Sequence, residues 1–145
     1  MTLPDRTQGN LQLSVCPESI RKLRDRVPRR YNLGRDAHIA LLYGAFREEW
    51  IDHIGREALI IVTSNAWSDR VQALRIDLPT EIECFCQDRV PHLVISWVDG
   101  ATPDEANSLF FSKSRVEDWF PDNTFYLRCL VGFTPWKVKE GDRHE

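Results

Sequence analysis

The chain has 145 residues, 42% of them hydrophobic and 28% charged, with a formal net charge of −3. This length predicts one domain with a single core, and the negative balance excludes nucleic-acid binding by charge alone, although a local basic patch could still hold phosphate. No apolar run approaches the roughly 20 residues that span a bilayer, and the N-terminus lacks a secretory-signal pattern. We therefore expect a soluble, cytoplasmic protein without membrane contact.

The apolar periodicity predicts elements in the order βαβαβββαβ. The expected strands cover residues 12–15, 37–43, 58–63, 71–78, 92–97 and 125–133, and the expected helices cover 17–27, 46–54 and 102–110. Residues 81–86 fit either a short strand or an extended loop, and residues 112–124 fit a surface loop. The pattern indicates an α+β fold in which helices pack on a largely antiparallel sheet. We expect an N-terminal extension (1–10), a single domain (11–136) and a charged C-terminal tail (137–145).

Four cysteines are too few and too irregularly spaced for a disulfide framework in a chain of this length. Cys84 and Cys86 form a C-x-C pair that could bind a metal together with His92, but a second ligand pair at regular spacing is missing. The sequence also lacks a glycine-rich phosphate loop. No metal and no cofactor is therefore expected.

Two histidines stand at the start of apolar runs of strand length, His38 and His92. Because a strand sends residues i and i+2 to one face, His38 should share a face with Ala40 and Leu42, and His92 should share one with Val94 and Ser96. Two imidazoles brought to one cleft would form an acid/base pair, since imidazole titrates near neutral pH. The alternative is that each histidine is a lone residue bonded to nearby backbone.

A basic tract precedes the first of these histidines. It contains Arg21, Lys22, Arg24, Arg26, Arg29 and Arg30, and Arg35 follows it. Such a run is either a solvated helix face or a surface that steers phosphate.

The two motifs, His38-Ile-Ala-Leu41 and His92-Leu-Val-Ile95, resemble the repeated His-hydrophobic-Thr/Ser-hydrophobic motif of the two-histidine (2H, LigT-like) phosphoesterase superfamily. Pro91 and residues 96–109 are similar to the branch associated with RNA-repair enzymes, and the resemblance covers about residues 11–134. It implies two pseudo-symmetric lobes of antiparallel sheet with flanking helices. Each lobe would contribute one histidine strand to a central groove.

The resemblance implies metal-free hydrolysis of a phosphodiester, such as a 2′,3′-cyclic phosphate at an RNA end, with His38 and His92 as the catalytic pair. The phosphate-holding hydroxyls of the family are replaced here by Ala40 and Val94. Ser96 lies roughly 6.6 Å beyond His92. Other groups that could hold the substrate are Tyr43, Arg35, Asn107, Lys113 and Arg115.

Three alternatives stay open. The substrate could be a cyclic nucleotide or an oligonucleotide. The domain could instead be a catalytically degenerate module that binds RNA or a nucleotide, or an interaction domain, and RNA ligase or kinase domains would then be natural partners. The third hypothesis is a plain α+β scaffold without a small-molecule site.

Overall fold

The computed structural model describes residues 8–34, 38–88, 90–110, 115–120 and 122–136. Its elements in chain order are β1 (Gln8–Val15), α1 (Pro17–Arg26), β2 (His38–Ala45), the 3-10 helix η1 (Glu48–Trp50), β3 (Glu57–Trp67), β4 (Val71–Asp77), α2 (Thr80–Glu83), β5 (His92–Trp97), the 3-10 helix η2 (Pro103–Ser108), β6 (Arg115–Asp118) and β7 (Phe125–Pro135). Among these helices none is long and apolar enough to cross a membrane. The first strand begins inside the predicted extension 1–10, and the predicted tail 137–145 lies outside the described residues.

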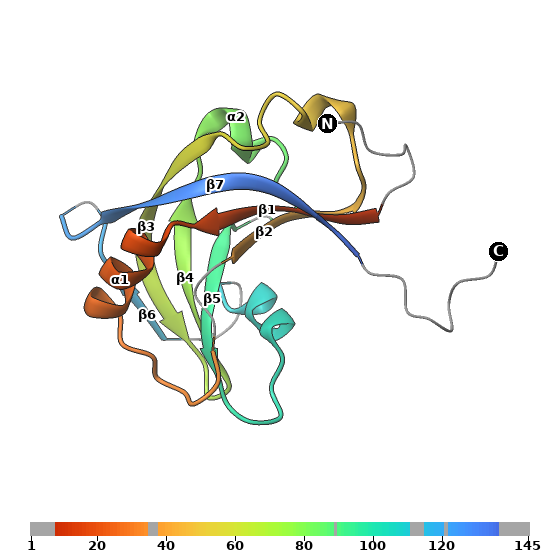
Figure 1. Cartoon of the computed structure of the whole chain (residues 1–145). Helices are drawn as coiled ribbons and strands as arrows, with labels where there is room; N and C mark the ends of the chain where they lie inside the picture. The colour runs from red at the N-terminus through yellow and green to blue at the C-terminus, as the bar shows by residue number, and fades with distance from the viewer. Residues whose placement is uncertain (1–7, 35–37, 89, 111–114, 121, 137–145) are drawn as a thin grey trace.

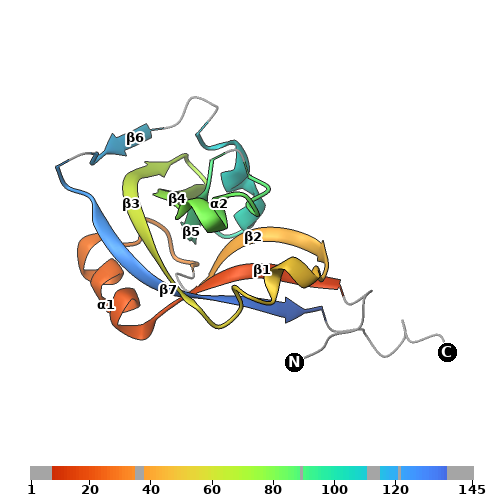
Figure 2. The same cartoon turned by 90° about the horizontal axis from the view of Figure 1, so that it is seen from above.

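The described strands form one seven-stranded antiparallel sheet in the order β2-β1-β7-β3-β4-β5, with β6 paired to β3. The expected two separate sheets are wrong, because β7 pairs with β1 along one side and with β3 along the other, and so joins the two halves. Each half nevertheless has three strands with a histidine-bearing strand at its outer edge. The sheet curls until these two edges approach each other, giving a shape close to a barrel (Figures 1 and 2).

Backbone hydrogen bonds connect the two edges on both sides of His38. Before it in the chain, Leu33 and Trp97 exchange a pair of hydrogen bonds with N–O distances of 3.1 and 2.8 Å. After it, Gln87 N–H donates to the carbonyl of Leu41 at 2.8 Å. The seam between the two edge strands is thus fixed above and below the first histidine.

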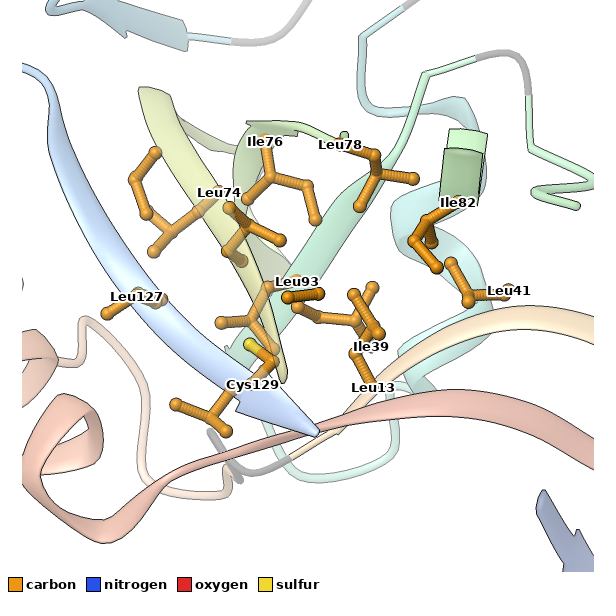
Figure 3. Packing of buried hydrophobic residues seen from close by; sticks show 14 of the residues in the cluster. Leu13, Ile39, Leu41, Leu74, Ile76, Leu78, Ile82, Leu93, Leu127 and Cys129 are labelled. Atoms are coloured by element: carbon orange, nitrogen blue, oxygen red, sulfur yellow. The ribbon is translucent and has the colours of Figure 1, made fainter. Parts of the chain in front are cut away.

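The core fills the inside of this curved sheet. Apolar side chains alternate along β1, β2, β5 and β7, so that every second residue points inward. Figure 3 shows the inward residues from these strands and from β4 and α2 meeting in one cluster, among them Leu13, Ile39, Leu74, Ile82, Leu93 and Leu127. Because β2 and β5 each face the core with one side, their histidines are left on the other side.

Helix α1 begins at Pro17, as its sequence predicts, since proline is favoured at the first helical position. Its Leu23 and the following Val27 are buried, while the arginines of the basic tract are exposed.

The other predicted helices are shorter than expected. Residues 46–54 form only η1 and a series of turns ending at Gly55, whose φ of 86° favours glycine. The i, i+4 spacing of Phe46 and Trp50 reflects an edge-on ring contact, with centroids 5.8 Å apart, rather than a long amphipathic helix. Trp50 is fully buried, so the spacing marks core contact correctly although the element is different.

Three further assignments differ from the sequence-based expectation. The undecided residues 81–86 contain the end of α2. The predicted strand 58–63 continues as far as Trp67, and the predicted loop 112–124 contains the short strand β6, which pairs with that extension. Strand β6 is exposed throughout, so it has no buried alternation by which its sequence could be recognised.

Candidate functional site

His38 opens β2 and His92 opens β5, and both line one hollow of about 540 Å³, counted out to the open solvent. The described residues that line it are His38, Ala40, Tyr43, Gln87, Asp88, His92, Val94, Pro103, Asp104 and Asn107. The structure therefore brings together six of the residues singled out from the sequence, and adds four others.

His38 is held by the neighbouring strand β1. Ser14 is its register partner, and its Oγ lies 3.3 Å from His38 Nδ1. The amide Nε2 of Gln12 lies 3.4 Å from the same ring nitrogen. An amide nitrogen can only donate, so Nδ1 of His38 serves as the acceptor and the proton of the neutral ring is on Nε2.

His92 is held through the same ring nitrogen but by the opposite kind of partner. Its Nδ1–H donates to the backbone carbonyl of Val90 at 2.8 Å. A carbonyl can only accept, so the neutral ring keeps its lone pair on Nε2. The ring also packs against Phe110 from the segment after η2, with centroids 6.0 Å apart. In each histidine Nδ1 is engaged, which leaves Nε2 for a ligand.

Ala40 and Val94 both line the hollow, two residues after their histidines. These are the positions at which the resembled family carries hydroxyls. Their half-buried side chains present only methyl groups to a ligand.

Ser96 is not part of the hollow, contrary to the expectation that it shares a face with His92. A β-bulge makes Ile95 an extra residue of β5, because Ala73 pairs with Val94 while Gln72 pairs with Ser96. The bulge interrupts the alternation of side chains. Ser96 is fully buried, and its hydroxyl donates to Gln72 Oε1 at 2.6 Å.

A second bulge, in β2, removes Leu42 from the histidine face and brings Tyr43 there instead. Leu11 pairs with Leu42 and Gln12 pairs with Ala40, which leaves Leu41 as the extra residue. Leu42 consequently packs against the core, and Tyr43 lines the hollow.

Gln87 also lines the hollow, although no sequence pattern singles it out. Its side-chain Oε1 accepts the backbone N–H of Tyr43 at 3.0 Å, and its own backbone N–H bonds to Leu41. With Oε1 engaged, the amide N–H groups of Gln87 are available as donors, as is the amide of Asn107 on η2. Its position depends on the seam between the strands, which local spacing does not reveal.

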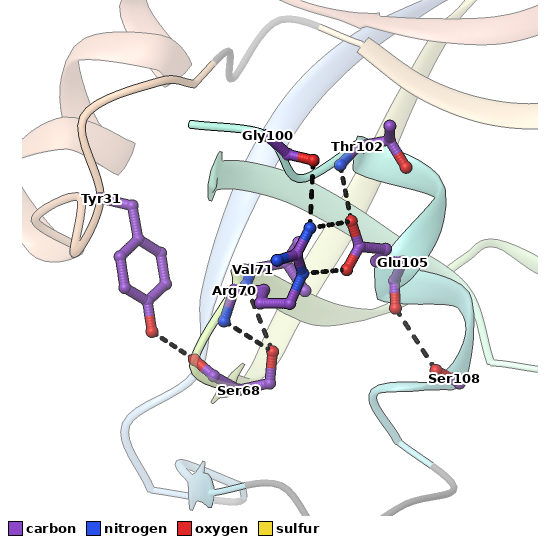
Figure 4. A network of polar contacts seen from close by, with 8 residues as sticks. All are labelled: Tyr31, Ser68, Arg70, Val71, Gly100, Thr102, Glu105 and Ser108. Carbon is purple, nitrogen blue, oxygen red and sulfur yellow. Dashed lines mark hydrogen bonds and ion pairs between the residues drawn. The ribbon is translucent and has the colours of Figure 1, made fainter. Parts of the chain in front are cut away.

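The wall formed by η2 is fixed by a polar network (Figure 4). Thr102 N–H donates to Glu105 Oε2 at 2.8 Å, one half of the capping box expected at this helix start. Arg70, in the turn between β3 and β4, donates to Glu105 Oε1 at 2.6 Å and to the carbonyl of Gly100 at 3.0 Å. The hydrogen bond from Arg70 lowers the pKa of the Glu105 carboxyl, with help from the Thr102 N–H.

The charges in the hollow are mixed. Asp88 and Asp104 line it together with the two imidazoles, and the described lining residues include no lysine or arginine. Arg75 stands close by, since it is the register partner of His92 across β4 and β5 and its side chain is exposed on the same outer face. The sequence shows that Arg75 alternates with buried Leu74 and Ile76, but the residue opposite it depends on the strand register.

The remaining predicted candidates are not gathered here. Arg35 and Lys113 lie outside the described residues. Arg115 opens β6, where it pairs with Trp67, and it does not line the hollow. His53 packs on Phe85, with ring centroids 5.2 Å apart, in keeping with the structural role expected for it.

The C-x-C pair shows no metal-site geometry. The exposed Cys84 thiol donates to the carbonyl of Glu81 at 3.4 Å, and burial raises the pKa of Cys86. In the part of the chain that the structure describes, no three His, Cys, Asp or Glu side chains are grouped as metal ligands would be.

A fungal RNA kinase of known structure is similar to this chain, with a TM-score of 0.58 and 12% sequence identity. The similarity covers 90% of this chain and 47% of the kinase structure, so the chain spans about half of that protein. No protein-family model and no curated protein sequence matches. At this identity the likeness shows a shared fold alone: the chain is similar in fold to a part of an RNA kinase.

Proposed function

We propose that the protein is a phosphodiesterase that opens a 2′,3′-cyclic phosphate at an RNA end, with His38 and His92 as its acid and base. One observation carries the proposal: two histidines from the outer strands of the two halves line a single open hollow. The resemblance of both motifs to the 2H superfamily supports the same chemistry. The fold likeness to an RNA kinase is compatible with action on RNA ends.

The hydrogen bonds at Nδ1 assign different roles to the two imidazoles. The Nε2 lone pair of His92 accepts a proton from water, whose oxygen attacks the phosphorus. The bond from phosphorus to one ribose oxygen breaks, and Nε2–H of His38 gives its proton to that leaving oxygen. The product is a phosphomonoester with a free ribose hydroxyl. His92 then holds the extra proton, and transfer through solvent restores the starting state.

Ala40 and Val94 weaken this site relative to one with two hydroxyls. A hydrogen bond to a charged group contributes about 1.5 to 3 kcal/mol, so the absence of two such bonds slows turnover substantially. Tyr43, Gln87 and Asn107 are the described residues that can donate to phosphate in their place.

The second candidate function is nucleotide binding without turnover. The same two methyl-bearing residues favour it, together with the carboxylates of Asp88 and Asp104, which oppose the developing charge of a pentacoordinate phosphate. Such a domain would work beside other RNA-end enzymes, as the partial coverage of the kinase suggests.

The test is hydrolysis of a short RNA ending in a 2′,3′-cyclic phosphate, followed by chromatography. His38→Ala and His92→Ala should each lower kcat/KM by about 10² to 10⁴-fold. His53→Ala is the matched control, because that ring packs on Phe85 outside the hollow. Binding of the RNA without turnover in the unchanged protein would select the second candidate, and neither binding nor turnover would refute both.

A further inference from the structure

A second hollow, of about 490 Å³ out to open solvent, lies over the outer face of β3 and β4. Its lining residues are Thr63, Ser64, Arg75, Asp77, Asp118 and Phe120. No sequence motif marks any of these residues, and the chemistry proposed for the histidines does not use them.

The strand register connects this hollow to the histidine site. His92 pairs with Arg75, Arg75 pairs with Ser64, and Ser64 pairs with Asp118, so one row of residues crosses four strands. Neighbouring strands are about 4.8 Å apart, which puts Ser64 roughly 10 Å from His92. A ligand fixed by its phosphate between the imidazoles would therefore reach the second hollow with the part attached to that phosphate.

The rim of the hollow presents an aromatic face. Phe120 is 65% exposed, an unusual state for a large apolar side chain. Asp118 Oδ1 fixes the turn that carries it, since it accepts the backbone N–H of Phe120 at 3.2 Å and the hydroxyl of Ser64 at 3.4 Å. An exposed and positioned aromatic ring is suited to stack on a nucleobase.

The charges of the hollow favour a base over a second phosphate. Two carboxylates, Asp77 and Asp118, face one guanidinium, that of Arg75. Carboxylates repel phosphate but accept hydrogen bonds from an exocyclic amino group. Asp118 already bonds to protein groups, whereas Asp77 has no partner within the described part of the chain, so Asp77 is the acceptor left for a ligand.

We infer that this hollow binds the nucleobase of the nucleoside that carries the cyclic phosphate, with Phe120 stacked on the ring and Asp77 accepting an amino group. The inference rests on the proposed function of the histidine site and adds a substrate preference to it. Bases with an amino group at the Watson–Crick edge bind well. Uracil binds poorly, because it presents a carbonyl oxygen where cytosine has its amino group.

The experiment compares 2′,3′-cyclic CMP with 2′,3′-cyclic UMP, which differ at that position. The unchanged protein should prefer the cytidine compound by about tenfold in kcat/KM. Asp77→Asn should bring the ratio close to one, because an amide can both donate and accept. Phe120→Ala should lower kcat/KM for both compounds by about tenfold through KM.

Asp52→Asn and Tyr126→Ala are the matched controls, an exposed carboxylate and an exposed aromatic ring that do not line the hollow. If turnover is absent, the same comparison is made with Kd. Equal use of the two compounds, unaffected by Asp77→Asn and Phe120→Ala, would overturn this inference and leave the phosphodiesterase standing. Failure to bind or hydrolyse either compound would overturn the proposed function and this inference with it.

Discussion

Leu41 and Ile95 occupy equivalent positions in two strands: each is the extra residue of a β-bulge three places after a histidine. Bulges re-aim the side chains that follow them. In β2 the bulge moves Tyr43 to the hollow, and in β5 it removes Ser96 from it. The two halves therefore share a local backbone irregularity as well as a motif, which supports a common plan for the two histidine strands.

The positions of Ala40 and Val94 make a gain-of-function test possible. Ala40→Thr with Val94→Thr should raise cyclic-phosphate hydrolysis by about ten- to a hundredfold, because each hydroxyl can add a charge-assisted hydrogen bond to the phosphate. The measurement is kcat on the RNA substrate, with melting temperature recorded in parallel.

The gain should vanish when His92→Ala is added to the double variant. A variant that melts much earlier and gains no activity would mean that the new hydroxyls lie unsatisfied against apolar neighbours, at about 1 to 3 kcal/mol each, and that the alignment with the family motif is wrong.

Acid should destabilise the η2 wall through Glu105. Its pKa is lowered from the ordinary value of 4.5, first by the hydrogen bond from Arg70, so protons bind the unfolded chain more tightly than the folded one. The stabilisation is complete above pH 4.5 and is lost as the pH falls through the lowered pKa. Glu105→Gln should therefore flatten the fall in melting temperature on acidification, whereas Glu48→Gln, an exposed carboxylate on η1, should leave a steeper fall.

The basic tract on α1 should contribute to RNA binding by long-range attraction. Arg21 is exposed there, and replacing it by Gln should reduce the slope of log Kd against log salt by about one if its guanidinium neutralises one phosphate. Arg56→Gln, outside the tract, should leave the slope unchanged. Titration of the RNA at several salt concentrations measures it, and identical slopes for the two variants would restrict recognition to the hollows.

The thiols should differ strongly in reactivity. Burial raises the pKa of Cys129 to about 12, so at pH 8 it stays protonated and enclosed, whereas Cys84 is exposed. Alkylation followed by peptide mass spectrometry should label Cys84 in the native protein and Cys129 only after unfolding. Early labelling of Cys129 would show that the sheet opens readily around β7.

Local pattern was sufficient for much of this structure. The alternation of Phe125, Leu127 and Cys129 predicts an inward face of β7, and these residues are buried in the core. The capping sequence beginning at Thr102 predicts a helix start, and η2 begins at the following residue. These features depend on neighbours in the chain, so the sequence reports them directly.

Features that depend on pairing between distant strands were out of reach. Regular alternation places Ser96 on the histidine face, and only the register with Gln72 and Ala73 reveals the extra residue that moves it away. Gln87 and Arg75 reach the site through pairing with β2 and β5, which no local spacing encodes. The halves form one sheet rather than two for the same reason, since the partners of β7 lie far away in the chain.

Strand β7 also determines when the histidine pair can come into being. It lies between β1 and β3, yet it is the last of the seven described strands to be synthesised. A nascent chain that ends before Phe125 already contains both histidines but lacks the strand that holds their halves together. Because pairings so distant in sequence form slowly, assembly of the site is tied to late folding events, and an incomplete chain would not present the two imidazoles to RNA.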